Sequence, residues 1–226
     1  MSAPTARSGV VPAYAELHCR SNFSFLTGAS HPEELVARAH QLGYTALAIT
    51  DECSLAGVVR AHGEAKRLGL HLIVGAEMRL TPAAAGGEPG ARLVLLAQSR
   101  RGYGNLAQWI TVALRRAEKG TYLAQMSDVE GRVPHAPYLA GLPDCFALLV
   151  PEPNQGDESL FAQAMWLKTW FGVERCAIAV ELLHRAYDAA LVEGVQHVAE
   201  LTGLALVAAG DVLMHSRAHK PLQDAL

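Results

Sequence analysis

Three residues of types that bind metal ions, His18, Glu77 and Asp211, each lie at or near the end of a short apolar run. A neutral imidazole and carboxylates are donors that Zn²⁺ and Mn²⁺ accept. The carboxylate pair Asp51 and Glu52 follows another apolar run. If the ends of these runs meet, one imidazole and four carboxylates would form a metal-binding constellation. From the residues alone, the alternative that these side chains cap helices or satisfy loops stays open.

Such a site needs elements that bring the ends of several strands together. Short runs rich in leucine or β-branched residues alternate with longer amphipathic stretches, which is typical of parallel β/α units. The predicted strands are residues 14–19, 46–50, 72–77, 92–97, 146–150, 177–182 and 204–209. In a parallel β/α barrel the loops after the strands converge on one face, where functional sites form. The pattern therefore predicts an α/β barrel with the candidate ligands on that face.

The first predicted helix has the clearest boundaries. Ser30 followed by Glu33 forms the pattern of a capping box at its start. Pro32 suits the first turn and Gly43 suits the end. Further helices are predicted at residues 55–68, 103–117, 158–171 and 188–202.

The composition is that of a globular chain without the charge of a nucleic-acid-binding domain. Half of its 226 residues are hydrophobic, so one α/β barrel is as economical a reading as two small domains. Its 19 basic residues are outnumbered by 22 acidic residues, for a formal net charge of -3. Proteins that hold a polyanion by counterion release carry a basic surface instead. Tight DNA binding by this segment alone is therefore not expected.

Cysteine usage and the apolar pattern indicate a cytoplasmic protein. No C-x-x-C pair occurs, which favours reduced thiols in the core for Cys19, Cys53, Cys145 and Cys176. No apolar run approaches the roughly 20 residues of a membrane span, so no membrane partner is expected. Residues 1–11 lack the order of a signal peptide and are predicted to be a flexible leader.

The last residues suggest a continuation. Residues 220–226 begin like a helix, with Pro221 in the first turn, and stop after about one turn, which is too short to be stable alone. This predicts that residues 12–226 form one domain of a fragment truncated from a longer protein. The preceding residues 214–220 are predicted to be a solvated linker.

Several motifs in the same order resemble the N-terminal PHP (polymerase and histidinol phosphatase) domain of bacterial C-family DNA polymerases, which are similar to polymerase III alpha. They lie at residues 17–26, 46–52, 73–77, 92–97, 102–106 and 209–215, so the resemblance covers nearly all of residues 14–226. Residues 19–35 and 50–54 look like the error-prone, DnaE-like type named ImuC. The resemblance implies a PHP-type distorted (β/α)7 barrel.

Metal-loaded members of this family bind several divalent ions and activate water for phosphoester hydrolysis. Carried over one at a time, the ligand positions fall on His18, Arg20, Thr27, Glu52, Glu77, Arg92, Asp211 and Leu213. The resemblance implies that the ligand type is kept at His18, Glu77 and Asp211 and replaced at the others. A further ligand in the middle of the chain has no clear counterpart, and His184 is the nearest candidate.

The replacements predict a degenerate site without catalytic residues or a resident metal. Arginine stays protonated and donates no lone pair, so it repels a cation. At least one of the guanidinium groups of Arg20 and Arg92 is instead expected within about 4 Å, the usual ion-pair distance, of Glu52, Glu77 or Asp211. Arg20→Ala should then destabilise the domain by on the order of 3 kcal/mol. A single weak ion on His18, Glu77 and Asp211 remains the alternative.

The resemblance also implies a function. The parent protein would be an error-prone DNA polymerase acting in translesion synthesis and damage-induced (SOS) mutagenesis, with Mg²⁺ and DNA engaged by polymerase domains of the same chain and with mutagenesis accessory proteins as partners. This fragment would be a catalytically inert scaffold that needs no cofactor. The alternatives are a metal-dependent phosphoesterase or 3′–5′ proofreading exonuclease, and a docking module for the accessory proteins.

Overall fold

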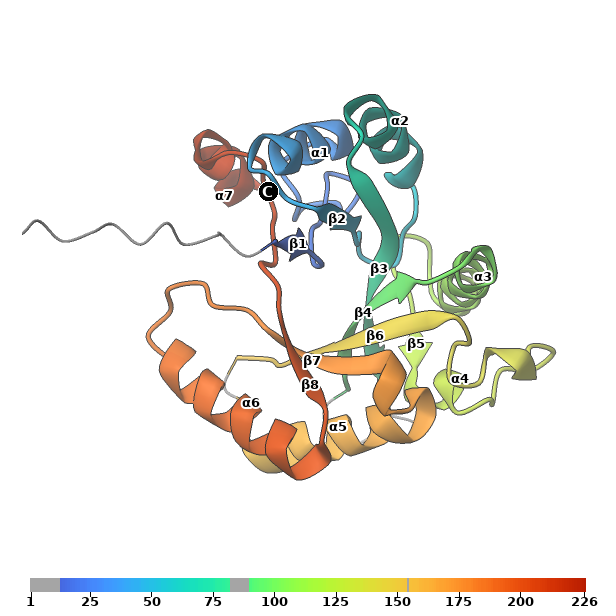
Figure 1. Ribbon diagram of the computed structural model, residues 1–226. Coiled ribbons are helices and arrows are strands. Elements are labelled where there is room, and N and C mark those ends of the chain that lie inside the picture. The colour runs from blue at the N-terminus through green and yellow to red at the C-terminus, as the bar shows by residue number, and fades with distance from the viewer. Residues whose placement is uncertain (1–12, 82–89, 154) are drawn as a thin grey trace, which may run out of the picture.

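The computed structural model describes residues 13–81, 90–153 and 155–226, and Figure 1 shows their arrangement. The predicted leader at residues 1–11 lies outside this part of the chain. The fold is α/β and is built on one eight-stranded sheet. Its strands are β1 (Ala15–Glu16), β2 (Ala46–Ile49), β3 (His71–Thr81), β4 (Arg92–Ala97), β5 (Ala124–Gln125), β6 (Cys145–Val150), β7 (Cys176–Val180) and β8 (Ala205–Ala208).

The sheet is mostly parallel and strongly curled. Its order is β1-β2-β3-β4-β6-β7-β8, with β5 paired to β3. The prediction of parallel units is wrong for β4, which runs antiparallel to both β3 and β6. The physical reason is that only about ten residues separate the end of β3 at Thr81 from the start of β4 at Arg92, fewer than the dozen or more that a parallel crossover requires. A parallel bridge between Cys19 and Val212 joins the two ends of the curled sheet.

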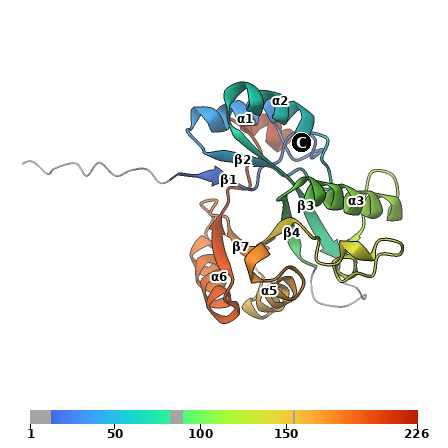
Figure 2. The ribbon, with the colours of Figure 1, turned by 45° about the vertical axis from the view of Figure 1, so that its right-hand side comes forward.

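The helices gather in two groups at opposite ends of the sheet (Figures 1 and 2). The first group comprises α1 (Pro32–Gln41), α2 (Val58–Leu68) and the short α7 (Lys220–Ala225), and the second comprises α5 (Asp157–Phe171) and α6 (Asp188–Thr202). Helix α3 (Arg100–Arg116) and the single turn α4 (Met126–Val129) cover the side near β5. Short 3₁₀ turns η1, η2 and η3 lie at Pro137–Leu139, Val173–Arg175 and Arg217–His219.

The predicted helices are all present, but the predicted cap of α1 is shifted by one residue. The backbone N–H of His31 donates to Glu34 at 2.8 Å, so the capping pair is His31 with Glu34. The predicted pair of Ser30 with Glu33 is wrong, because the hydroxyl of Ser30 lies against His215 instead. Gly43 follows the helix with φ of 74°, a left-handed conformation that glycine adopts without strain.

The core lies on both surfaces of the sheet. The larger apolar cluster packs β3, β4, β6 and β7 against α3, α5 and α6, and a second cluster lies under α1 and α2. Inside the curl, a layer of mostly small side chains includes Ala48, Val94, Leu148 and Ala177. The cysteines are buried and free, as the sequence predicts. Among the described residues, no helix combines the length and apolar character needed to cross a membrane.

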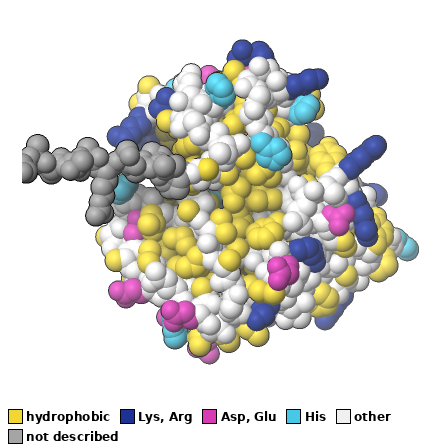
Figure 3. Space-filling model, in the orientation of Figure 1, with side chains coloured by type: hydrophobic (Ala, Val, Ile, Leu, Met, Phe, Trp, Pro, Cys, Tyr) yellow, Lys and Arg dark blue, Asp and Glu magenta, His cyan; other side chains and the backbone are white. Residues whose placement is uncertain are grey.

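The face drawn in Figure 3 carries no large patch of basic side chains, which is in keeping with the slightly acidic composition. Lysine and arginine side chains lie mostly toward the rim of that face, and hydrophobic side chains gather near its centre. Some acidic side chains lie beside basic ones on the right of this face, and others gather at its lower left. This face therefore lacks the continuous positive surface that binding of a nucleic-acid backbone requires.

Candidate functional site

The candidate site lies at one end of the curled sheet, where several strands deliver side chains to one place. His18 follows β1, Glu181 follows β7 and Asp211 follows β8. Glu77 belongs to the long strand β3. Arg20 follows His18 by two residues. We call His18, Arg20, Glu77, Arg92, Glu181 and Asp211 the buried ion-pair cluster.

The antiparallel direction of β4 explains how Arg92 reaches this cluster. Arg92 opens β4 and pairs with Val150, the last residue of the parallel strand β6. The first residue of β4 therefore lies at the edge where its neighbours end. Side chains alternate along a strand, so Arg92 points to the same side as Val94, which belongs to the apolar layer inside the curl. The guanidinium group of Arg92 therefore lies next to this apolar layer and is nearly excluded from water.

His18 is fully buried between carboxylates. Its Nε2 lies 2.8 Å from Glu77, and its Nδ1 lies 2.5 Å from Glu181. Ionised carboxylates only accept hydrogen bonds, so both ring nitrogens must carry protons and the imidazole is cationic. Burial alone would lower the pKa of His18, but the hydrogen bonds with Glu181 and Glu77 outweigh it and raise the pKa from 6.5 to about 9.

Two guanidinium groups engage the same acids. Arg92 donates through Nε and Nη2 to both oxygens of Glu77, each at 3.0 Å, and Arg20 lies 2.5 Å from Asp211 and 3.4 Å from Glu77. The predicted ion pairs of Arg20 and Arg92 are thereby confirmed. Burial favours the neutral form of Glu77, but hydrogen bonds from His18 and Arg92 hold its pKa well below the usual range. The charges of His18, Arg20 and Arg92 likewise overcome the burial of Asp211 and lower its pKa.

The charges of the six cluster residues balance, and the half-exposed Arg79 lies 3.4 Å from Glu77 at the border of the cluster. The cations of His18, Arg20 and Arg92 face the carboxylates of Glu77, Glu181 and Asp211. A buried carboxylate without a partner would cost several kcal/mol, and here each one has at least one close cation. The arrangement neutralises acidic side chains without requiring any bound ion.

Not every predicted position joins this cluster. Asp51 is buried elsewhere, where it accepts hydrogen bonds from the hydroxyls of Ser21 and Ser24. Glu52 accepts from Tyr122 at 2.8 Å and approaches Arg79 rather than Arg20 or Arg92. The expectation that four carboxylates converge is therefore wrong for Asp51, which the loop around residues 21–24 takes up, whereas Glu52 borders the cluster because Arg79 lies near both Glu52 and Glu77. Outside the cluster also lie Thr27, His184 and Leu213.

Sequence reasoning missed Glu181 and Glu16. Glu181 follows β7 directly and is a closer counterpart of the unplaced mid-chain ligand than His184, which is exposed. Its position near the end of the predicted strand at residues 177–182 was the available signal. Glu16 is buried and accepts the backbone N–H groups of His18 and Gly210, each at 2.9 Å. Glu16 thereby fixes the backbone on both sides of the cluster.

The residues present do not fit a cluster of several catalytic metal ions. Donor atoms of His18, Glu77 and Asp211 lie within 4.8 Å of one another, which is close enough to be compared with a metal site. However, the lone pairs of Glu77 point at His18 and Arg92, and the protonated imidazole of His18 offers none. A metal ion would have to displace two guanidinium groups and a proton before it gained these ligands.

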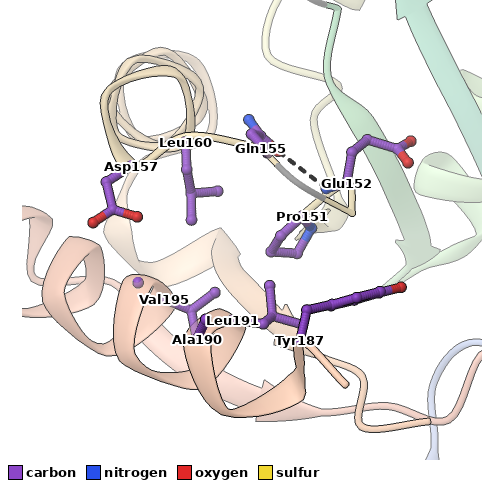
Figure 4. A pocket seen from close by; sticks show the side chains of 10 residues that line it. Pro151, Glu152, Gln155, Asp157, Leu160, Tyr187, Ala190, Leu191 and Val195 are labelled. Atoms are coloured by element: carbon purple, nitrogen blue, oxygen red, sulfur yellow. Dashed lines mark hydrogen bonds between the residues drawn. The ribbon is translucent and has the colours of Figure 1, made fainter. Parts of the chain in front are cut away.

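A pocket of about 230 Å³ opens beside the cluster. Its lining includes the cluster residues Arg20, Arg92, Glu181 and Asp211, together with Arg79 and Arg185. A neighbouring apolar cavity of about 190 Å³ lies between α5 and α6 (Figure 4). Leu160 and Val195 face each other across this second cavity, while the carboxylate of Glu152 turns away from it. The chemistry-bearing groups therefore belong to the first pocket.

Comparison with known protein families assigns the chain to a family. A family model described as the PHP domain matches residues 16–149. The chain belongs to the PHP domain family. This assignment confirms the family predicted from the motifs, and the curled α/β sheet confirms the PHP-type distorted barrel.

Curated relatives identify which branch of the PHP family the chain resembles. It is 51% identical over 219 residues, 97% of this chain, to the error-prone DNA polymerase of Bordetella parapertussis. It is also 51% identical over 226 residues, 100% of this chain, to the protein of the same name in Ralstonia nicotianae. The PHP chain spans about a fifth of the length of these relatives, since it covers 20% and 21% of them.

Solved structures share the PHP barrel at low sequence identity. One, from Bifidobacterium adolescentis and assigned as a metal-dependent phosphoesterase, is 15% identical with a TM-score of 0.60, over 91% of this chain and 89% of that one. Another, an amidohydrolase from Chromobacterium violaceum with bound sulfate and no metal, is 17% identical with a TM-score of 0.64, over 89% and 88%. At this identity the likeness establishes the fold alone.

Proposed function

We propose that this PHP domain is a catalytically inert scaffold within an error-prone DNA polymerase that acts in translesion synthesis and damage-induced mutagenesis. The relatives named error-prone DNA polymerase support the parent protein. In such a parent, the polymerase domains of the same chain would engage DNA and Mg²⁺, with mutagenesis accessory proteins as further partners. The PHP domain would brace those domains and contribute no reaction of its own.

One observation carries the scaffold proposal. The guanidinium groups of Arg20 and Arg92 hold Glu77 and Asp211 at positions where the PHP resemblance implies metal ligands. Fixed side-chain cations supply the neutralising charge but cannot activate water, because a guanidinium group has no open coordination position. Replacing metal ions by arginine side chains keeps this end of the barrel packed and its charges balanced. A domain that braces its neighbours requires both.

The second candidate is a metal-dependent phosphoesterase, including a 3′–5′ proofreading exonuclease. The solved relative assigned as a metal-dependent phosphoesterase favours it, as does the close grouping of His18, Glu77 and Asp211. The two candidates differ in whether a divalent ion enters the buried ion-pair cluster.

We expect protein purified without chelator to carry less than one equivalent of divalent metal per chain and to hydrolyse neither phosphodiesters nor phosphomonoesters with added Mn²⁺ or Zn²⁺. Elemental analysis and assays with single-stranded oligonucleotides and a chromogenic phosphate ester measure both. Two or more tightly bound ions, or hydrolysis that disappears in Asp211→Asn, would overturn the scaffold proposal and favour the phosphoesterase.

The parent polymerase provides a separate test. We expect His18→Gln in the full-length protein to leave primer extension within a few-fold, because the histidine would hold no catalytic ion. The exposed residue His197 supplies the matched control, His197→Gln. A large loss of extension in His18→Gln at an unchanged melting temperature would contradict a bracing role.

A further inference from the structure

A second group of metal-binding residue types lies away from the buried ion-pair cluster. Glu34 on α1, His215 after β8 and His219 in η3 each offer a donor atom, and these atoms lie within 4.8 Å of one another. In the stretch from 214 to 220, which was predicted to be a solvated linker, Arg217, Ala218 and Lys220 are exposed, but His215 and His219 contact the rest of the domain. His215 and the hydroxyl of Ser30 lie 2.8 Å apart, and His219 contacts the carbonyl of Ala29 at 2.9 Å.

The surroundings prepare the imidazoles to bind a cation. A carbonyl oxygen only accepts, so the Nδ1 of His219 carries the proton and its Nε2 keeps a free lone pair. Metal-bound histidines commonly make this hydrogen bond to a backbone carbonyl through the other ring nitrogen. The hydroxyl of Ser30 can donate or accept, so His215 can adopt either neutral tautomer. The two rings are held edge to face, with centroids 4.3 Å apart.

Glu34 supplies the negative charge of this group. Its Oε2 lies 3.7 Å from the Nδ1 of His215, which is the one basic side chain within ion-pair distance among the described residues. No guanidinium group therefore occupies the position of a cation here, in contrast to the buried ion-pair cluster. All three side chains are partly exposed, and a pocket of about 250 Å³ lined by His31, Glu34 and His219 adjoins them.

We propose that Glu34, His215 and His219 bind one divalent transition-metal ion of the Zn²⁺ class. Two imidazoles, one carboxylate and one water make a tetrahedral sphere with ligand atoms about 3.3 Å apart, given metal–ligand distances of roughly 2.0–2.1 Å. The donor atoms, now up to 4.8 Å apart, reach that spacing by small side-chain rotations. Imidazole with carboxylate selects Zn²⁺ or Co²⁺ over Mg²⁺, which prefers an all-oxygen sphere.

The ion fastens the segment after β8 to the first helix. That segment already pairs with the chain near its start, since Val212 bonds His18 and Arg20, each at 2.9 Å, and Leu213 accepts from Ala29 at 2.8 Å. The same segment carries Asp211 into the buried ion-pair cluster. Metal binding therefore stabilises the position of Asp211 without entering that cluster.

The test uses the whole chain with ZnCl₂ or CoCl₂ alone. We expect one equivalent of Zn²⁺ to bind in the micromolar range by calorimetry, and bound Co²⁺ to show the visible absorption of tetrahedral coordination. Zn²⁺ at a hundredfold excess over Kd should raise Tm by about 5 °C. Glu34→Gln and His219→Gln should each abolish binding and the Tm increase, and the exposed control His197→Gln should leave both unchanged.

The possible outcomes separate this site from the proposed function. Absence of binding, or binding that survives both Glu34→Gln and His219→Gln, overturns the new site. Binding that instead disappears in Asp211→Asn places the ion in the buried ion-pair cluster and overturns the scaffold proposal as well. A micromolar ion is lost during purification, so the new site is compatible with less than one equivalent of metal in the purified protein.

Discussion

Arg92→Ala is expected to lower the free energy of unfolding by about 3–5 kcal/mol, the usual cost of leaving a buried charge without its partner. The guanidinium group of Arg92 makes two hydrogen bonds to Glu77, and both side chains are buried. Alanine removes those bonds and leaves Glu77 with His18 and with the longer contacts to Arg20 and the half-exposed Arg79, each at 3.4 Å. Chemical denaturation monitored by circular dichroism measures the loss.

The exposed residue Arg101 provides the matched control. Arg101→Ala should change stability by no more than about 0.5 kcal/mol, as is usual at the surface. The double variant Arg92→Ala with Glu77→Gln should recover part of the loss, because it removes the buried carboxylate that has lost its two-bond partner. Equal stability of Arg92→Ala and Arg101→Ala would mean that the ion pair is solvated and that the account of the cluster is wrong.

Stability is expected to fall by on the order of 2–3 kcal/mol between pH 6 and pH 8.5 because of His18. The pKa of His18 is raised from 6.5 to about 9 in the folded protein. Its contribution is therefore complete below pH 6.5 and is lost as the pH rises toward 9. The pKa values of Glu77 and Asp211 are lowered, so their contributions are lost only on the acidic side and do not affect this window.

Urea denaturation at half-unit pH steps measures this slope, and His18→Gln should flatten it. The series stops at pH 8.5 because burial also raises the pKa of the Cys53 and Cys145 thiols to about 12. Because these thiols resist ionisation in the folded protein, the folded state loses stability as the pH rises above the ordinary thiol pKa of about 9. That loss would add a second slope to the plot of stability against pH. Histidine NMR offers a direct reading, and an imidazole of His18 that titrates near pH 6.5 would refute the prediction.

Local patterns in the sequence were enough to predict most of the fold. Apolar runs located the strands, and helix boundaries followed from residues such as Pro32 and Gly43. The direction of β4 was not predictable from its own residues, because a buried strand has the same composition in either direction. The deciding signal was the short chain separation between β3 and β4, which is too small for a parallel crossover.

The candidate site was predictable where residues of opposite charge replaced ligands at strand ends. The ion pairs of Arg20 and Arg92 with Glu77 and Asp211 were predictable, because a guanidinium group is always charged and pairs with nearby carboxylates. Glu181 could not be ranked above its neighbours, because the exact end of β7 decides which side chain turns inward. The separation of Asp51 from the cluster was also hidden, since it depends on hydroxyls that a loop brings from 30 positions away.

The bridge between Cys19 and Val212 has a consequence for biosynthesis. The ion pair of Arg20 with Asp211 spans 191 positions, so the cluster cannot be completed until almost the whole domain has left the ribosome. Until then, the basic side chains near the start and the acidic ones from later strands remain hydrated. Contacts between residues so far apart in the sequence form late and slowly, because closing the long loop between them costs conformational entropy. The nascent domain can therefore gain these ion pairs only after residue 212 has been synthesised and released.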